Sequence, residues 1–255
     1  APTTTAVPAT ADQLLSALPT LADLPKDSKV YDSTASTQFE PESGNYEGDC
    51  GKVDVDGLAQ AQGAVTTAST PWADIPQGGS TSRVGSAGMR LYAFGNSEQA
   101  SLFVSAAKAL YSCELDYTIP EGTGAGQLGT SLGANGLGAG VVWNIHESMS
   151  TAPVDAPAGD EAILAKQDLT YSTTAADKAY GSIDHSVRLL ERHGRIVIVG
   201  ILRGWTNLAG HADPYFDRQP YFLEYEPSFA DLLGLADLLR PGIIAKLVAA
   251  QALAA

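Results

Sequence analysis

Cysteine is scarce in this chain, which has only Cys50 and Cys113 among its 255 residues. Two thiolates cannot complete a tetrahedral zinc site, and no histidine lies at ligand spacing from either of them. The two residues also do not form the C-x-x-C pair of a thiol oxidoreductase. The sequence therefore leaves two alternatives, one disulfide or two separate buried thiols.

Positive charge is scarce as well. The chain has 15 Lys and Arg against 29 Asp and Glu, a net charge of −14, and charged residues make up only 17% of it. The average share is about 25%. Binding to nucleic acid or to an anionic membrane surface needs clustered lysine and arginine, so the composition argues against both. Low charge and many Thr, Ser and Gly residues favour an extracytoplasmic location, where a disulfide is the usual state of a cysteine pair.

Hydrophobic runs are too short to cross a membrane, because a spanning helix needs about 18 consecutive apolar residues. The nearest candidate, residues 243–255, is shorter and is interrupted by Lys246 and Gln251. Residues 1–10 are rich in Pro, Thr and Ala and are predicted to be a flexible linker. Such a start is typical of a mature secreted chain, or of a lipoprotein without its anchoring cysteine. We expect contact with a membrane only through such a lipid anchor.

Hydrophobic residues make up 44% of the chain, which is enough for one sizeable core. We expect a single domain over residues 11–255, in which residues 206–255 form a C-terminal helical extension. Periodicity predicts a set of helices and a set of strands. The helices are predicted over residues 11–18, 97–113, 228–239 and 243–255, and the strands over 84–94, 140–146, 161–172 and a hairpin over 186–203. This order predicts an α+β fold with an antiparallel sheet.

Three details of these elements are specific enough to test. Pro241 and Gly242 are predicted to end the helix that begins after Ser228. His193 and Gly194 are predicted to form the two-residue turn of the hairpin. The continuously apolar run over residues 196–202 predicts a central strand that is covered on both faces.

Catalytic and cofactor motifs are weak in this sequence. The glycine-rich stretch over residues 121–140 contains a G-x-G-x-x-G match and a G-x-S-x-G match around Ser131. Neither match follows a predicted strand or begins a predicted helix, as a dinucleotide site or a nucleophile elbow requires. Carboxylates two residues apart are interpreted as solvated faces of strands. We therefore predict no catalytic residue, metal or cofactor.

Two strand ends carry an aromatic residue near a residue that can bear positive charge. Trp143 and His146 lie on one predicted strand, and Arg203 and Trp205 end the apolar strand. Such pairs often line small-molecule pockets, so these four are the predicted ligand-binding residues. The alternative is a tryptophan at the edge of the core beside a solvated His or Arg.

A Leu-rich segment, LLSALPTLADLP, begins the domain. After Cys50 come a Pro-Trp pair, a strand and a helix, FGNSEQASLF, that leads to Cys113. The apolar strand RIVIVGI and an Ala-rich C-terminal helix complete the order. Over residues 11–205 this arrangement resembles the PknH-like extracellular sensor domain family of actinobacteria, whose members occur as kinase ectodomains and exported lipoproteins.

The resemblance implies a twisted antiparallel sheet flanked by helices, and a cleft proposed to bind a ligand. It also implies that Cys50 and Cys113 form the family's helix-linked disulfide. Two features depart from the family: a second disulfide is absent, and residues 206–240 are an addition. The family supplies no catalytic residues.

We therefore expect an extracytoplasmic small-molecule-binding or sensor-type domain, the soluble part of a lipoprotein, with a ligand of unknown class. One alternative is an exported hydrolase or isomerase on the same scaffold, with a carboxylate and His146 as acid and base. A second alternative is a protein-interaction module, which would bind a partner or form a homodimer through its C-terminal helices.

Overall fold

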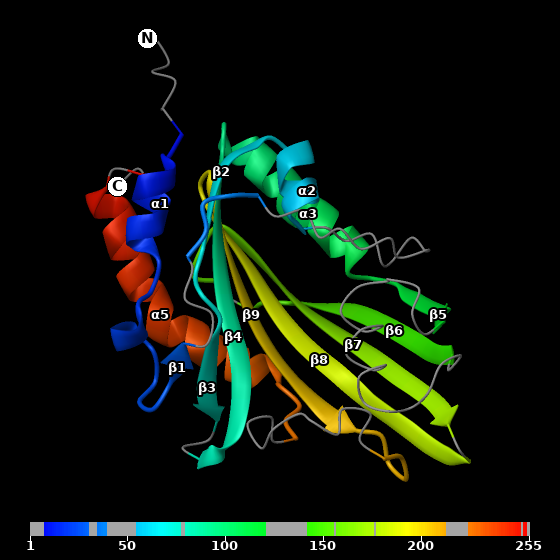
Figure 1. The fold of residues 1–255 in the computed structure, drawn as a ribbon. Coiled ribbons are helices and arrows are strands. Elements are labelled where there is room, and N and C mark those ends of the chain that lie inside the picture. Colours follow the sequence, from blue (N-terminus) through cyan, green and yellow to red (C-terminus); the bar gives the residue numbers. More distant parts are fainter. Residues whose placement is uncertain are drawn as a thin grey trace, which may run out of the picture.

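The computed structural model describes residues 8–30, 35–39, 55–77, 80–120, 142–155, 157–175, 177–212, 224–250 and 252–253. In this part of the chain the fold is α+β, as predicted (Figure 1). The helices are α1 (Ala11–Ala17), the 3-10 turn η1 (Leu21–Asp23), α2 (Val55–Ala61), α3 (Ser97–Leu110) and α5 (Phe229–Ala249). The strands are β1 (Lys29–Val30), β2 (Ala64–Ser69), β3 (Ala73–Gln77), β4 (Ser80–Phe94), β5 (Glu114–Pro120), β6 (Val142–Pro153), β7 (Glu161–Ala175), β8 (Lys178–His193) and β9 (Ile196–Asn207).

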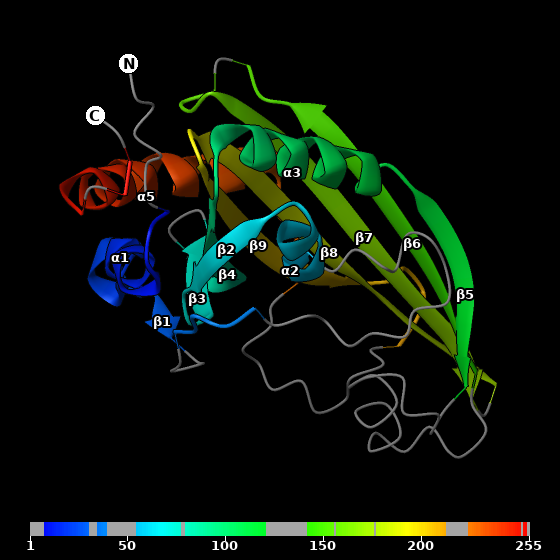
Figure 2. The same ribbon diagram turned by 90° about the horizontal axis from the view of Figure 1, so that it is seen from above.

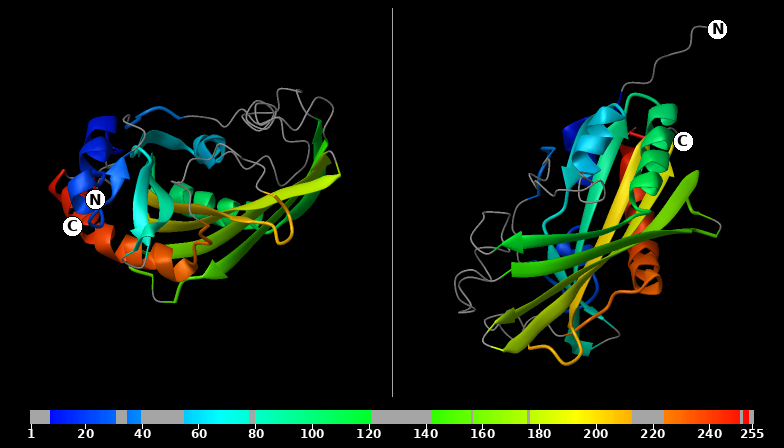
Figure 3. Two further views of the ribbon diagram at one scale, coloured as in Figure 1. Left: turned by 60° about the horizontal axis from the view of Figure 1, so that its bottom comes forward. Right: turned by 90° about the vertical axis from the view of Figure 1, so that its right-hand side faces the viewer.

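All of these strands belong to one sheet, in which every described pair is antiparallel. The order is β1-β3-β4-β9-β8-β7-β6-β5, and β2 also pairs with β4. The long strands β4 and β6 to β9 fan out as the sheet twists (Figure 3). The predicted antiparallel sheet is therefore confirmed.

Strand β9 lies between β4 and β8 in the middle of the sheet. Its alternate residues point to opposite faces of the sheet. Val197 and Val199 belong to the core beneath α3, together with Phe103. Ile196 and Ile198 belong to a second core, beneath α1 and α5. The strand is thus covered on both faces, as its apolar sequence predicts.

Side-chain caps fix where three of the helices begin. Thr10 and Gln13 form a capping box on α1, and Asn96 accepts a hydrogen bond from the backbone of Gln99 at the start of α3. Ser228 and Asp231 likewise form a capping box at the start of α5. Each cap satisfies backbone N–H groups that have no partner within the helix.

The prediction of two C-terminal helices is wrong, because α5 runs unbroken through Pro241 to Ala249. A proline inside a helix costs about 3 kcal/mol. Packing outweighs this cost, since Leu239, Ile243 and Leu247 are spaced by four residues and all enter the same core. Burial in this core thus keeps the helix continuous where the local sequence predicts that it ends.

The hairpin turn is shifted by one residue from its predicted place. His193 pairs with Ile196, so the two turn residues are Gly194 and Arg195. Gly194 has φ 58, and a turn of the II′ type needs a positive φ at this first central position.

The predicted disulfide and the glycine-rich stretch over residues 121–140 fall outside the described residues. Cys113 packs against the core beneath α3, but Cys50 is not described, so the disulfide stays a prediction. Among the helices that the structure describes, none is both long and apolar enough to cross a membrane.

Candidate functional site

The first and last helices of the chain pack side by side on one face of the sheet (Figures 1 and 2). Leu14 and Leu18 of α1 share a core with Ile243 and Leu247 of α5. The side-chain amide of Gln13 also donates to the backbone carbonyl of Ala250, at 2.6 Å. The two helices therefore form one layer over β4 and β9.

A cavity of about 280 Å³ lies between this layer and the sheet. Its walls come from α1, η1, β1, β3, β4, β9 and α5, together with the residues before β1 and β3. The lining consists of Leu15, Leu18, Pro19, Thr20, Leu21, Leu24, Val30, Ala35, Thr70, Pro71, Ala73, Ala87, Gly88, Met89, Gly200, Ile201, Leu232, Leu235, Ala236 and Leu239.

The lining is almost purely hydrocarbon. Among the described residues that form it, none is charged and none is aromatic, and the only hydroxyls belong to Thr20 and Thr70. Both hydroxyls are already used, since Thr20 Oγ1 donates to Asp23 at 2.9 Å and Thr70 Oγ1 accepts from the Met89 N–H at 2.9 Å. The walls therefore offer dispersion and the hydrophobic effect, and no group for acid-base chemistry.

Small residues create the hollow. A Cβ placed on Gly200 would meet only one atom within ordinary contact distance, Leu232 Cδ1 at 3.7 Å. Ala87 and Ala236 are buried and lie on the cavity walls. A strand that presents glycine and alanine beneath a helix leaves room that a larger side chain would fill.

The cavity opens to solvent near η1. Three lining residues, Leu15, Leu21 and Val30, are exposed by 38%, 51% and 40%. Large apolar side chains in contact with water are notable where they gather at one place, because such patches mark interaction sites or ligand-binding grooves.

The four predicted ligand-binding residues do not line this cavity. Trp143 is only 2% exposed and packs with Ile145, Tyr171 and Tyr180. His146 lies three residues further along β6 and therefore on the opposite face of the sheet. Its imidazole is near two carboxylates, with Nδ1 2.9 Å from Asp116 and Nε2 3.4 Å from Glu114.

Arg203 and Trp205 lie two residues apart and share a face of β9. Cross-strand pairing places Trp143 on the same face, which is the face that α3 covers. The Arg203 guanidinium stacks over the Trp72 ring at 4.3 Å, and Trp205 is 6% exposed. The sheet thus brings three of the four to one face. Their role in ligand binding stays a prediction.

That same face carries a buried carboxyl group. Glu147 is 3% exposed, and it accepts a hydrogen bond from the Gln167 amide at 2.6 Å. Arg188 in turn donates to Gln167 Oε1 at 2.8 Å. Burial raises the pKa of Glu147, although the Gln167 hydrogen bond and the Arg188 charge oppose this shift.

A second polar network lies on the face of the sheet that α5 covers, outside the cavity lining. His185 is 5% exposed, its Nδ1 lies 2.7 Å from Asp168 and its Nε2 lies 3.0 Å from Thr206 Oγ1. Lys166 forms ion pairs with Asp168 at 3.2 Å and with Glu226 at 2.6 Å. Desolvation would raise the pKa of Asp168, but the His185 hydrogen bond and the Lys166 charge outweigh it and lower that pKa.

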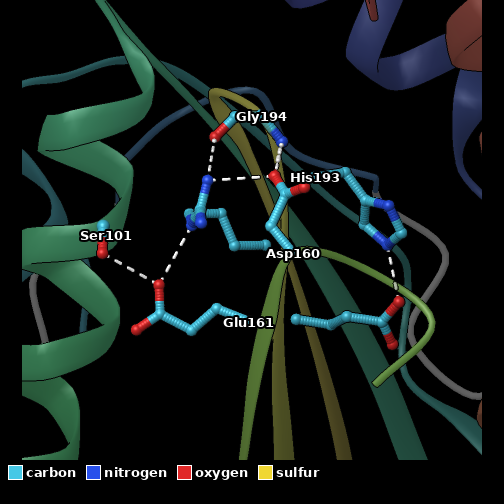
Figure 4. Close-up of polar contacts among 7 residues, drawn as sticks. Ser101, Asp160, Glu161, His193 and Gly194 are labelled. Atoms are coloured by element: carbon cyan, nitrogen blue, oxygen red, sulfur yellow. Dashed lines mark hydrogen bonds and ion pairs between the residues drawn. The ribbon is translucent and has the colours of Figure 1, made fainter. Parts of the chain in front are cut away.

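A third network surrounds the β8–β9 turn (Figure 4). Arg192 contacts Asp160 and Glu161 at 3.0 Å each, and Ser101 of α3 donates to Glu161 at 2.9 Å. The backbone N–H of Gly194 donates to Asp160 at 2.7 Å. These contacts fasten the turn and the start of β7 to α3, which gives them a structural role.

Within the described residues, no group of three or more His, Cys, Asp or Glu side chains is arranged to hold a metal ion. Sequence reasoning missed the cavity, although a signal for it exists. Leu-rich segments occur near both ends of the domain. The sequence does not show that they meet.

Comparisons with known proteins give a distant similarity of fold. No protein-family model matches the sequence, and no curated protein matches it. Among solved structures, the crystal structure of the extracellular domain of PknH from Mycobacterium tuberculosis is similar, with a TM-score of 0.44 and 8% identity over 94% of this chain and 99% of that chain. The similarity is distant and concerns the overall fold alone.

Proposed function

We propose that this chain is an extracytoplasmic binding or sensor-type domain whose cavity between α1, α5 and the sheet holds an apolar small molecule. The observation that carries the proposal is the hydrocarbon lining of that cavity. The extracytoplasmic location rests on the acidic, low-charge composition. Attachment through an N-terminal lipid anchor is part of the same proposal.

The lining selects the class of ligand. Sugars and nucleotides need hydrogen-bond partners and aromatic rings to stack on, and the described lining offers neither. An alkyl or isoprenoid chain needs only apolar contact, worth about 25 cal/mol for each Å² removed from water. A flexible hydrocarbon chain therefore fits these walls best.

The position of the cavity supports a sensing role. Part of its wall is α1, a helix of seven residues that is joined to α5 by the Gln13 hydrogen bond and by a Lys246 bond to the Leu18 carbonyl at 3.1 Å. A ligand that touches both helices stabilises their contact, because binding favours the state that makes the contacts.

A glycine-to-valine pair tests the proposal. Gly200→Val places a side chain inside the cavity, whereas Gly234→Val makes the same change on the exposed side of α5, where no atom lies within 4 Å of the new Cβ. We expect wild type and Gly234→Val to bind the fluorescent probe N-phenyl-1-naphthylamine equally, and Gly200→Val to bind it about tenfold more weakly or worse. Equal binding by all three proteins would remove the cavity as the site.

A second candidate function, an exported hydrolase, is favoured by the hydrogen-bonded series of Thr206, His185 and Asp168. A hydroxyl on one imidazole nitrogen and a carboxylate on the other is the arrangement that activates a nucleophile. A fluorophosphonate probe distinguishes the two functions. An adduct on Thr206 that is lost in Thr206→Val supports the hydrolase, and no adduct leaves the network a structural one.

A further inference from the structure

We infer that the ligand of the cavity is an acidic amphiphile, a single alkyl chain whose carboxylate or phosphate head binds the ammonium group of Lys246. This inference rests on the proposed function and adds the head group, which the hydrocarbon lining leaves open. Its starting point is the position of Lys246, a cation beside the wall of an uncharged cavity.

Lys246 lies seven residues after Leu239, a lining residue, and two helical turns place both on the same side of α5. Its Nζ donates to the backbone carbonyl of Leu18, another lining residue, at 3.1 Å. The ammonium group therefore sits where α5 meets the end of α1, at the edge of the cavity.

The same place borders the open end of the cavity. Leu21, which lines the cavity and is 51% exposed, begins the η1 turn that ends at Asp23. The Lys246 side chain is itself 38% exposed. A chain that enters beside Leu21 would leave its head group in water, within reach of this cation.

Lys246 has donors to give to such a head group. An ammonium group has three N–H donors, and the Leu18 carbonyl takes one of them. Asp23 lies 3.6 Å away, an ion-pair distance rather than a hydrogen bond. The Asp23 carboxylate is held instead by Thr20, whose N–H and hydroxyl donate to it at 2.8 and 2.9 Å.

Other charges near the opening offset one another. Lys26 and Lys29 are exposed, but Asp27 lies between them in the sequence and Asp74 is the cross-strand partner of Lys29. The preference for an anionic head group therefore rests on Lys246, whose Nζ contacts the lining residue Leu18.

The test compares head groups on one chain length. Dodecanoate, dodecyl phosphate, dodecanol and dodecyltrimethylammonium compete with the fluorescent probe for the wild type, for Lys246→Met and for Lys108→Met, which changes an exposed lysine of α3. In the wild type and in Lys108→Met we expect at least one of the two acids to bind about three- to tenfold more tightly than the alcohol, and the cation to bind most weakly. In Lys246→Met we expect the preference for the acids to disappear, while loss of the Leu18 bond weakens binding of all four compounds by a similar factor.

Lys246→Arg is the second variant, because it keeps the charge if the methionine variant is poorly folded, and it should restore the preference. Equal affinity for all four compounds in the wild type, or a preference that persists in Lys246→Met, would overturn the head-group assignment alone. Failure of all four compounds to displace the probe would overturn the proposed function as well.

Discussion

The side-chain amide of Gln13 donates to the backbone carbonyl of Ala250 across 237 positions of sequence, at 2.6 Å. The bond joins the first helix of the domain to the end of the last one. Because α1 and α5 both supply walls of the candidate cavity, the stability of the α1–α5 contact and the integrity of the binding site are linked.

Gln13→Glu should break this junction while keeping the helix cap. The Gln13 Oε1 atom accepts from the Thr10 N–H at 2.8 Å, and a glutamate can do the same, but it cannot donate to Ala250. We expect a loss of about 1–3 kcal/mol in the free energy of unfolding, with weaker probe binding. Gln60→Glu, an exposed change of equal charge on α2, is the control and should shift stability by less than about 0.5 kcal/mol. Equal effects would contradict the linkage.

Two glycines in open surroundings should respond to alanine in opposite ways. No atom lies within 4 Å of a new Cβ at either Gly194 or Gly234, but Gly194 has φ +58 and Gly234 lies within α5. Gly234→Ala should stabilise the fold by about 0.5–1 kcal/mol, because alanine loses less backbone entropy in a helix. Gly194→Ala should destabilise it by about 1 kcal/mol, because a left-handed backbone is strained for alanine. Thermal unfolding measures both, and a shift in the same direction would contradict the turn geometry.

Glu147→Gln should stabilise the protein at neutral pH. The folded pKa of Glu147 is raised, chiefly by burial, so the fold favours the protonated carboxyl group. That contribution is complete below the unfolded pKa and is lost as pH rises through the folded pKa. The wild type should therefore be less stable than Glu147→Gln at pH 7, with the difference shrinking towards pH 4. A difference that grows as pH falls would refute the assignment.

Asp168→Asn should show the reverse dependence on pH. The folded pKa of Asp168 is lowered, since the His185 hydrogen bond and the Lys166 charge outweigh desolvation. Its contribution is present above the unfolded pKa and is lost as pH falls through the folded pKa. We expect the variant to be about 1–3 kcal/mol less stable than the wild type at pH 7, and nearly as stable below pH 3, by urea unfolding. A cost that stays the same at both pH values would mean that the charge of Asp168 is unimportant.

The predicted disulfide between Cys50 and Cys113 is tested by counting free thiols. Titration of thiols under denaturing, non-reducing conditions should find none, if Cys50 and Cys113 are paired. Two reactive thiols would contradict the disulfide and would weaken the argument for an extracytoplasmic location.

The fold could be predicted where local pattern and tertiary packing agree. The amphipathic α3, the capped α1 and the apolar β9 are of this kind, and each lies where its sequence indicates. Strands β2, β3 and β5 were not predicted, because Pro71, Pro76 and short polar stretches hide their alternation. The helical run through Pro241 could not be predicted either, since only the core beneath α5 stabilises it.

The candidate site was less predictable than the fold. A cavity between the sheet and the helices α1 and α5 depends on a contact between those helices, and no local pattern encodes which surfaces meet. The aromatic residues that the sequence predicted as ligand-binding, Trp143 and Trp205, are buried on the face of the sheet opposite to the cavity. Small residues such as Gly200 define the hollow, and a single sequence gives them no distinguishing pattern.

The most direct test of the central claim is native mass spectrometry of the protein purified from its own host, followed by denaturing extraction of whatever it carries. We predict a bound molecule with an alkyl chain that is present in the wild type and in Gly234→Val and absent from Gly200→Val. A polar, chain-free ligand, or a ligand that Gly200→Val retains in full, would contradict the claim that the cavity between α1, α5 and the sheet is the binding site.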